Sequence, residues 1–404
     1  MSLSHVKALE EQSLLQTYRR YDLLVDRGSG AYLFDKSNKR YLDLLAGIGV
    51  NALGYGHPRM LRILRKQIKR PLHISNLLYH EYQGRLGDRL TQLSGLDRVF
   101  FSNSGTEAVE GCLKLARAHS NARDSATGTN RVLALESSFH GRSLGALSAT
   151  HSLKYRSPFE PLLTGFEFVQ FNNPEDLERQ FSDDVCAVIL EVIQGEGGIR
   201  PISEEFYRRA RTLTRETGAV LICDEVQCGL GRAGRWLALH KFAEPSERDA
   251  LPDLVSLAKP LGGGLPLGAT LMKEEIAAAI EPGLHGSTFG GGPLACRLGL
   301  EMLKVFEDEH ILEHVREVGS HFRQQLEELS DVPVIDEVRG EGLMLAIQLK
   351  VPAKELVKQL LDAGFITNAT DETVLRLLPP LIIRKKQIDK FIKALRPLLE
   401  TMDD

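Results

Sequence analysis

The sequence predicts an α/β fold, with a large domain built on a mostly parallel seven-stranded sheet and a smaller α+β domain after it. Two observations predict this fold. Short apolar runs alternate with helical patterns from about residue 51 to residue 272, and polar or glycine-rich segments follow directly after several of these runs. Alternating strands and helices favour a parallel sheet covered by helices, and such a sheet binds ligands at the carboxyl ends of its strands.

The predicted strands are short runs of apolar and β-branched residues. They lie at residues 98–102, 131–135, 166–171, 185–192, 219–223, 253–257 and 267–272. Helical spacing separates several of them, and residues 204–217 are the clearest case. The alternation therefore favours a sheet whose strands run mostly in one direction.

The pattern changes at about residue 293. A helix is followed by an apolar run at 343–349, a strand that contains Arg376, and a final helix near 387–402. We therefore expect a large domain over 51–292 and a small domain over 293–404, with residues 1–50 joining the small domain.

Composition excludes several function classes. The 404 residues are 43% hydrophobic and 26% charged, which is typical of a globular protein. The net charge of −4 gives no general attraction to nucleic acid or to an anionic membrane. The five cysteines lack metal-site spacing, and residues 1–11 mix charges without an apolar stretch, so we expect neither a signal peptide nor a membrane span there. We expect a cytoplasmic protein with reduced cysteines, no metal, no nucleic-acid partner and no membrane contact.

Lys259 and Asp224 are the most informative pair of residues. Lys259 stands in Ser-Leu-Ala-Lys-Pro-Leu-Gly-Gly-Gly (residues 256–264). Asp224 lies 35 residues earlier, at the end of the apolar run at residues 219–223. A lysine amine near a buried carboxylate suits pyridoxal phosphate, because the amine holds the aldehyde and the carboxylate keeps the pyridine nitrogen protonated. Each residue alone is more often structural, so the neighbouring motifs decide the interpretation.

Ser104, Gly105 and Thr106 open a predicted helix directly after the strand at 98–102. Glycine allows close backbone approach, and the free N–H groups of a first helical turn favour an anion such as phosphate. Ser104 followed by Glu107 is also a capping box, which needs no ligand. The two interpretations are compatible.

Further motifs follow other predicted strands. Phe139, His140 and Arg142 follow the strand at 131–135, where an aromatic ring could stack on a flat heterocycle and an arginine could bind a carboxylate. Gln-Gly-Glu-Gly-Gly (residues 194–198) follows the strand at 185–192, and residues 285–292 form a glycine-rich loop. An arginine inside an apolar strand, as at position 376, usually has an anionic partner.

These motifs, in this order, resemble the class III (ornithine-type) aminotransferases of the fold type I pyridoxal phosphate superfamily. The resemblance extends from Thr17 and Tyr18, through residues 47–54, to the strand of Arg376. It implies a pyridoxal 5'-phosphate cofactor and a homodimer with shared active sites. It also implies ping-pong transfer of the terminal amino group of N2-acetyl-L-ornithine to 2-oxoglutarate, as in arginine biosynthesis.

The resemblance assigns a role to each motif residue that binds the cofactor. Lys259 would hold the cofactor and then move the proton, and Asp224 would pair with the ring nitrogen. Phe139 and Val226 would pack on the two faces of the ring. The implied cofactor-binding residues are Ser104, Gly105, Thr106, Phe139, His140, Asp224, Val226, Gln227, Lys259 and Thr288, the last reaching the phosphate of the neighbouring subunit.

The resemblance also implies how two substrates share one site. Arg142, with Ser287 nearby, would bind the carboxylate of the amino donor, and Tyr18 would form a wall of the pocket. Arg376 would bind the carboxylate next to the keto group of 2-oxoglutarate. Glu196 would cover Arg376 while the donor is bound.

The chain departs from the family pattern at two places that bear on substrate preference. It has Glu-Val-Ile-Gln at residues 191–194, where the family usually has Glu-Pro-Ile-Gln, and Gly-Gly-Pro at 291–293 lacks the usual asparagine. The other donors that stay open are ornithine, 4-aminobutyrate, succinyldiaminopimelate and carrier-linked aminoadipate semialdehyde. The absence of an aromatic residue at 47–49 disfavours ornithine.

Two rival interpretations rest on single motifs. Residues 229–234 match the Gly-x-Gly-x-x-Gly fingerprint of a nucleotide-dependent oxidoreductase, although one such match is weak. Residues 59–70 contain six basic residues and no acid, which could form a contact for RNA or for a protein partner. We prefer the solvated face of an amphipathic helix that begins at Pro58.

Overall fold

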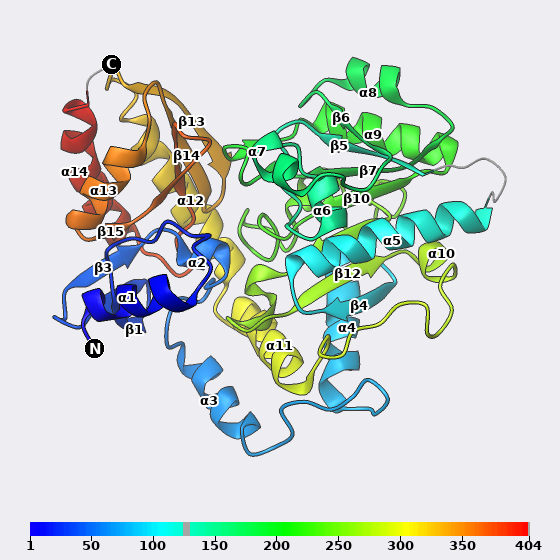
Figure 1. Cartoon of the computed structure of the whole chain (residues 1–404), viewed down its shortest axis with the longest axis horizontal. Helices are drawn as coiled ribbons and strands as arrows, with labels where there is room; N and C mark the ends of the chain where they lie inside the picture. Colours follow the sequence, from blue (N-terminus) through cyan, green and yellow to red (C-terminus); the bar gives the residue numbers. More distant parts are fainter. Residues whose placement is uncertain (124–129, 403–404) are drawn as a thin grey trace.

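The computed structural model describes residues 1–123 and 130–402. Its largest sheet has the strand order β4-β12-β11-β10-β7-β5-β6 (Figure 1). The strands are β4 (Arg98–Ser102), β5 (Arg131–Leu135), β6 (Phe166–Val169), β7 (Val185–Glu191), β10 (Val220–Asp224), β11 (Leu254–Leu257) and β12 (Gly268–Met272). Each coincides with a strand that the sequence predicts, with ends that differ by at most one or two residues. The predicted α/β fold class is confirmed.

Strand direction brings the chemistry-bearing segments to one edge of this sheet. β11, β10, β7, β5 and β6 pair in parallel, whereas β12 is antiparallel to both β11 and β4. β4 therefore runs in the same direction as the parallel strands. The segments that follow β4, β5, β7, β10 and β11 all leave from the same edge, and these are the segments that carry the predicted motifs.

Helices cover both faces of the sheet, which explains why its central strands β7, β10 and β11 are buried along their whole length. Successive residues of a strand point to opposite faces. In β10, Leu221 and Cys223 pack in one core cluster with α9 (Glu204–Thr217), and Val220 and Ile222 pack in a second cluster with α5 (Gly105–Arg123). Each face therefore buries alternate residues of the same strand, and no strand residue is left for solvent.

Residues from both ends of the chain form the second part of the molecule. β1 (Val25–Ser29), β2 (Tyr32–Asp35) and β3 (Arg40–Asp43) pair with β15 (Phe365–Ile366). A further sheet has the order β13-β14-β17-β16, with β13 (Ile335–Glu341), β14 (Met344–Leu349), β16 (Asn368–Thr370) and β17 (Val374–Leu377). We expected residues 1–50 to join the small domain, and the pairing of β3 with β15 is consistent with this. The domain boundaries themselves stay a prediction.

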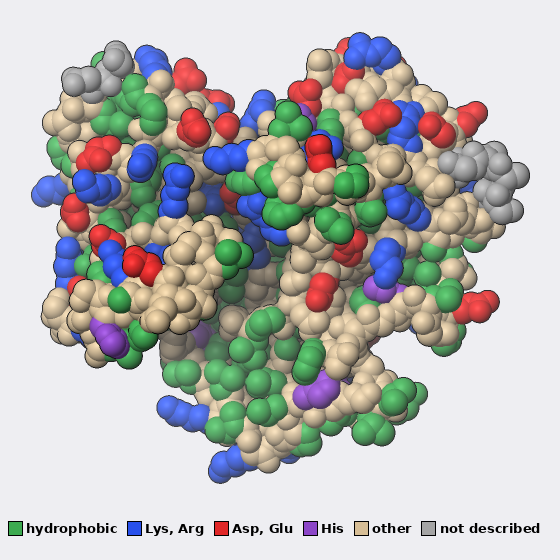
Figure 2. Space-filling model, viewed as in Figure 1, with side chains coloured by type: hydrophobic (Ala, Val, Ile, Leu, Met, Phe, Trp, Pro, Cys, Tyr) green, Lys and Arg blue, Asp and Glu red, His purple; other side chains and the backbone are tan. Residues whose placement is uncertain are grey.

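Helices complete this second part and connect it to the first. α12 (Ile311–Glu327), α13 (Lys354–Asp362) and α14 (Lys385–Glu400) lie beside its sheets, and α11 (Pro293–Asp308) packs against α3 (Pro58–Gln67) and α4 (Glu81–Ser94). Figure 2 shows a hollow between the two parts, with Lys and Arg side chains at its edge. The remaining short α-helices and strands are α1 (Leu3–Ser13), α2 (Ala46–Gly49), α6 (Leu144–Ser148), α7 (Leu153–Arg156), α8 (Pro174–Gln180), α10 (Glu274–Ala277), β8 (Ile193–Gln194) and β9 (Arg200–Pro201), and three 3-10 helices lie at η1 (Ser157–Phe159), η2 (Ala238–Lys241) and η3 (Lys259–Gly262).

The structure disfavours both rival motifs. Only a short 3-10 helix, η2 (Ala238–Lys241), follows the Gly-x-Gly-x-x-Gly run, and a Cβ added to Gly231 would lie 2.8 Å from the ring of Phe306 in α11. These glycines therefore allow close packing between the two parts of the molecule. In α3, Arg62, Arg65 and Lys66 are exposed, as a solvated helical face requires. Among the helices of the described residues, none is long and apolar enough to cross a membrane.

Candidate active site

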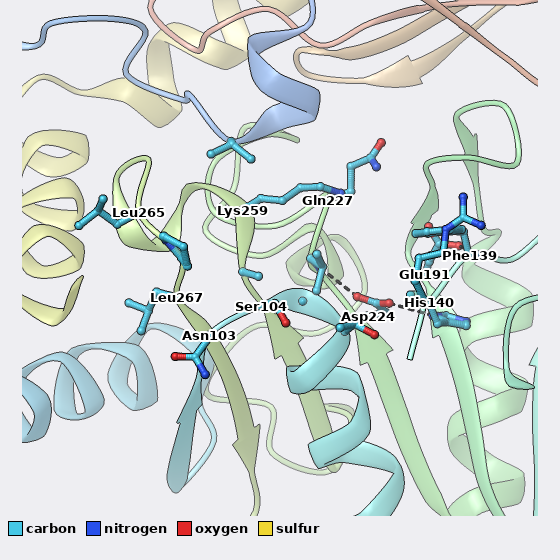
Figure 3. Close-up of a pocket in the computed structure, with 18 of the residues that line it drawn as sticks. Asn103, Ser104, Phe139, His140, Glu191, Asp224, Gln227, Lys259, Leu265 and Leu267 are labelled. Carbon is cyan, nitrogen blue, oxygen red and sulfur yellow. Dashed lines mark hydrogen bonds and ion pairs between the residues drawn. The ribbon is translucent and has the colours of Figure 1, made fainter. Parts of the chain in front are cut away.

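A cavity of about 470 Å³ lies at the carboxyl edge of the large sheet (Figure 3). It collects residues that are far apart in the sequence, because the strands that precede them end side by side. The predicted residues that line it are Ser104, Gly105, Thr106, Phe139, His140, Arg142, Asp224, Val226, Gln227 and Lys259. The topology therefore brings most of the predicted cofactor site together within one chain.

Asp224 lies at the floor of the cavity and is held from three directions. Its Oδ2 accepts a hydrogen bond from Nδ1 of His140 at 2.8 Å, and its Oδ1 accepts from Ser256 Oγ at 2.9 Å and from the backbone N–H of Val226 at 3.1 Å (Figure 3). His140 is buried, and its Nε2 has no hydrogen-bond partner among the described residues. Because a carboxylate only accepts hydrogen bonds, its partner nitrogen Nδ1 must carry the proton. His140 and Ser256 thus orient Asp224 toward the cavity.

Lys259 projects into the same cavity from the segment after β11. Its backbone has a φ of 40°, a left-handed conformation that is rare for lysine and that proteins retain mainly at functional sites. Burial lowers the pKa of Lys259 to about 8, an effect that the charge of Glu196 opposes and that of Arg376 reinforces. The amine can therefore be neutral, and hence nucleophilic, near physiological pH.

The first turn of α5 forms one end of the cavity. A Cβ added to Gly105 would lie 2.7 Å from Val226, so glycine is required for this close approach. Ser104 Oγ accepts from the backbone N–H of Glu107 at 3.3 Å, but the Glu107 carboxylate accepts from the N–H of Asn103 rather than from that of Ser104. The capping box predicted from the sequence needs two reciprocal hydrogen bonds. The bond to Ser104 Oγ is present, but the prediction that Glu107 accepts from the N–H of Ser104 is wrong. The same Glu107 oxygen also accepts from Asn103 Nδ2 at 3.0 Å.

The shape and chemistry of the cavity fit pyridoxal phosphate. The free N–H groups at the start of a long helix suit its phosphate, and Phe139 and Val226 supply apolar surfaces for a flat ring. The oriented carboxylate of Asp224 suits a protonated ring nitrogen, and the buried amine of Lys259 suits its aldehyde.

Arg142 lies at the rim of the cavity and is exposed. Its guanidinium group stands 3.8 Å from the centre of the Tyr155 ring and 5.2 Å from that of Phe139. Aromatic faces attract a cation and can fix the plane of its fork. Tyr155 was not among the predicted site residues, because no sequence motif marks it.

Arg376 has the anionic partner that its burial requires. It is 1% exposed in β17, and its Nη1 contacts Oε1 of Glu196 at 2.5 Å. Its Nε also donates to Asn368 Oδ1 at 3.1 Å. Burial raises the pKa of Glu196, but the charge and hydrogen bond of Arg376 outweigh this effect, so that pKa lies below its usual value. Gln227, which lines the cavity, lies 3.4 Å from Arg376 and links the ion pair to the site.

Five predicted residues do not line the cavity of this single chain: Glu196 and Arg376, whose ion pair adjoins it through Gln227, and Tyr18, Ser287 and Thr288. Tyr18 is 75% exposed, and Thr288 is exposed on the glycine-rich loop. Ser287 lies closer, because its Oγ accepts from Asn103 Nδ2 at 3.2 Å and Asn103 does line the cavity. The roles of these residues stay predictions.

Sequence reasoning missed two structural features of the site. Ala46, Gly47, Ile48 and Gly49 all have left-handed backbones, with φ between 50° and 83°. A Cβ added to Gly49 would lie 3.8 Å from Cδ of Lys259, so this turn forms part of the lysine's surroundings. The glycines signal a turn, but nothing in the sequence predicts a left-handed alanine or isoleucine. The second feature is the buried carboxyl group of Glu191 on the cavity wall.

Burial raises the pKa of Glu191 to about 7, and His140 lowers it in part. Glu225, which follows Asp224, is equally enclosed, and burial raises its pKa to about 7 as well. Glu225 does not line the cavity. The two carboxyl groups are thus similarly buried, but only Glu191 lines the cavity.

Comparisons with known proteins agree with this geometry. A family model described as aminotransferase class-III matches residues 16–399. The chain is 41% identical over 386 residues to the acetylornithine aminotransferase of Archaeoglobus fulgidus, which covers 96% of this chain and 98% of that protein. It is 43% identical over 387 residues to the acetylornithine aminotransferase of Aquifex aeolicus, with 96% and 99% covered.

Solved structures give the same result. The ornithine aminotransferase of Toxoplasma gondii superimposes with a TM-score of 0.93 at 29% identity, covering 99% of this chain and 95% of that one. The acetylornithine aminotransferase of Elizabethkingia anophelis superimposes with a TM-score of 0.85 at 30% identity, covering 99% of each chain. A further Toxoplasma gondii structure contains pyridoxal phosphate at partial occupancy in its active site. The chain therefore belongs to the class-III aminotransferases, a family of pyridoxal phosphate-dependent enzymes.

Proposed function

We propose that the enzyme transfers the terminal amino group of N2-acetyl-L-ornithine to 2-oxoglutarate, forming N-acetyl-L-glutamate 5-semialdehyde and L-glutamate in two half-reactions. The observation that carries the proposal is the presence of two different arginines beside one lysine. Arg142 is exposed at the rim, whereas Arg376 is buried and covered by Glu196. Full-length relatives named acetylornithine aminotransferase support the choice of donor. Such a reaction belongs to arginine biosynthesis.

The residues of the cavity have separate tasks in this proposal. Bound pyridoxal phosphate supplies an electron sink for the bond that breaks at the substrate carbon. Asp224, held by His140 and Ser256, keeps the ring nitrogen protonated. The first turn of α5 would hold the phosphate, Phe139 and Val226 would enclose the ring, and Gln227 would hydrogen-bond the ring hydroxyl. Nζ of Lys259 would move the proton from the substrate carbon to the carbon that bore the cofactor aldehyde, and in the opposite direction in the second half-reaction.

The two arginines allow one site to accept two substrates in turn. In the donor half-reaction, Arg376 is neutralised by Glu196, so the carboxylate of acetylornithine binds at Arg142 with Ser287 nearby and Tyr18 as a wall. In the second half-reaction, Glu196 moves aside and Arg376 binds the carboxylate next to the keto group of 2-oxoglutarate. Arginine suits both tasks, because its planar fork pairs with a carboxylate through two hydrogen bonds.

A single-turnover donor panel tests the proposed substrate. The holoenzyme is mixed separately with acetylornithine, ornithine, 4-aminobutyrate and succinyldiaminopimelate, and the visible absorbance of the cofactor is followed. We expect the fastest loss of absorbance with acetylornithine, and its recovery when 2-oxoglutarate is added. Fast loss with another donor alone would replace the substrate, and no loss with any donor would contradict the proposed function.

We also propose that the enzyme is a homodimer whose subunits complete each other's sites. Residues 68–80, between α3 and α4, expose a group of apolar side chains that includes Leu77 at 90% and Tyr79 at 104%. Asn76 in this segment donates to the backbone oxygens of Ser287 and Gly290, so the loop that carries Thr288 adjoins the same surface. Figure 2 shows apolar side chains gathered over this lower part of the molecule. Large exposed apolar patches are typical of interfaces.

Replacing Leu77 and Tyr79 with glutamate is expected to convert the dimer into monomers and to lower activity, because charges would be buried and Thr288 could not reach the neighbouring phosphate. Sedimentation and steady-state rates measure the two effects. Leu163→Glu, at a residue 45% exposed and outside this segment, is the matched control and should stay dimeric. A wild-type enzyme that is fully active as a monomer would refute the shared site.

The pKa of Lys259 predicts how covalent cofactor uptake depends on pH. The reactive form of the amine is neutral, and burial lowers its pKa from 10.5 to about 8. The rate at which apoenzyme takes up pyridoxal phosphate covalently should therefore rise as pH increases through about 8 and level off above it. Absorbance measures the rate, with Lys259→Ala as the control that takes up none covalently. A rate that keeps rising toward the ordinary pKa of lysine would contradict the burial effect.

A further inference from the structure

Glu191 is a buried carboxyl group to which the proposed mechanism gives no task. It ends β7, is 5% exposed and lies on the cavity wall beside Phe139 and His140 (Figure 3). Its Oε1 accepts a hydrogen bond from the backbone N–H of Phe139 at 2.9 Å, and its Oε2 accepts from that of Gly195 at 2.9 Å. Both oxygens of the side chain are thus occupied by backbone donors from two separate segments.

The two segments carry different parts of the site. Phe139 follows β5 and lines the cavity, and Gly195 directly precedes Glu196, which covers Arg376. β5 and β7 are paired neighbours, so a side chain at the end of β7 can reach both segments. Glu191 therefore spans from the ring-stacking residue to the residue that covers the second arginine.

The loop that begins at Gly195 has little freedom elsewhere. A Cβ added to Gly195 would lie 2.5 Å from the side chain of Gln227, and one added to Gly197 would lie 2.4 Å from the backbone oxygen of Ser137. Thr370 Oγ1 also donates to the backbone oxygen of Glu196 at 2.6 Å. The loop is thus enclosed on several sides, and the hydrogen bond from the N–H of Gly195 to the Glu191 carboxyl group fixes where the loop begins.

We infer that Glu191 is a positioning residue that links the Phe139 segment to the Glu196 loop, and that this link holds Glu196 over Arg376 until the second substrate arrives. The inference rests on the proposed two-substrate function, because it concerns when Arg376 becomes available. In the first half-reaction, an uncovered Arg376 would bind 2-oxoglutarate unproductively and exclude the donor.

Only a carboxyl group of this length can maintain the link. Glutamine keeps the size of the side chain but replaces one accepting oxygen with an NH2 group, which would face a backbone N–H donor. Glu191→Gln thus breaks one of the two bonds and leaves a buried N–H without a partner. Glu191→Asp keeps two acceptors but is one methylene too short to reach both nitrogens.

A matched control variant separates positioning from simple loss of stability. Glu225 is a buried carboxyl group one strand away, and it also accepts from two backbone N–H groups, those of Ala238 at 2.9 Å and Leu239 at 2.6 Å. It lies outside the cavity lining. Glu225→Gln should therefore lower the melting temperature about as much as Glu191→Gln without changing how Arg376 is covered.

The experiment measures inhibition of the donor half-reaction by 2-oxoglutarate in the wild-type, Glu191→Gln and Glu225→Gln holoenzymes. We expect 2-oxoglutarate to bind about tenfold more tightly as a dead-end inhibitor in Glu191→Gln only, as loss of one buried hydrogen bond implies. Equal inhibition constants in all three enzymes would overturn the inference.

If Glu191→Gln does not fold, Glu191→Asp provides the same test, with tighter inhibition expected and unchanged inhibition contradicting the link. Failure of the proposed function has a different signature, because the cofactor absorbance of the wild-type enzyme would then not fall on addition of acetylornithine.

Discussion

Replacing Lys259 with alanine is expected to lower turnover by roughly 10⁴-fold, the upper end of what a positioned acid–base group contributes. Of the described residues that line the cavity, Lys259 is the only lysine, so no neighbouring amine can substitute for it. The fold should persist, because burial already penalises the charged amine. Steady-state rates measure the loss, and circular dichroism with a cofactor titration tests whether the protein still folds and binds pyridoxal phosphate noncovalently.

Lys304→Ala is the control for this substitution, because Lys304 is exposed on α11 and does not line the cavity. It should keep wild-type rates. Turnover near the wild-type level in Lys259→Ala would remove Lys259 from the proposed proton transfer.

Replacing Arg376 with alanine is expected to slow the two half-reactions to different extents. Arg376→Ala should weaken the 2-oxoglutarate half-reaction by about 100-fold, in line with the cost of truncating one partner of a buried charge pair. The donor half-reaction should change much less, because Arg376 is covered by Glu196 during that step. Separate single-turnover measurements of the two half-reactions give the two values.

Arg142→Ala is the matched variant and should show the opposite pattern. It removes the exposed arginine at the rim, so the acetylornithine half-reaction should lose most of its efficiency while the keto-acid half-reaction loses less. Equal losses in both half-reactions for both variants would refute the division of tasks between the two arginines. Thermal unfolding is needed as a check, since Arg376→Ala leaves Glu196 buried without its partner.

Much of the fold could be predicted from local patterns. The strands β4 and β5 begin and end where the sequence predicts, and α9 spans 204–217 as expected. These segments are strongly apolar or strongly periodic, and they carry their own boundary signals, such as Ser203 before α9 and Gly218 after it. One local motif was predicted less completely. Glu107 follows the capping pattern in sequence, yet its carboxylate bonds to Asn103.

The residues to which we assign the chemistry could be proposed from the sequence because each stands in a motif in or next to a predicted strand. Asp224, Lys259 and Arg376 are residue types whose placement in or directly after an apolar run demands a reason. By contrast, Tyr155 and Glu191 have no such signal. Glu191 is one acid at the end of a strand, and its importance depends on which two backbone nitrogens the fold brings within reach.

The sequence by itself determined the fold class, the order of the strands along the chain and the family, and it predicted the lysine and carboxylate of the site. Only the tertiary structure decided which distant groups meet: His140 with Asp224 across 84 residues, Arg376 with Glu196 across 180, and Glu191 with both Phe139 and Gly195. The reason is physical. Periodicity and capping act within a few residues, whereas these contacts depend on strand order, direction and close packing, which arise only when the whole sheet assembles.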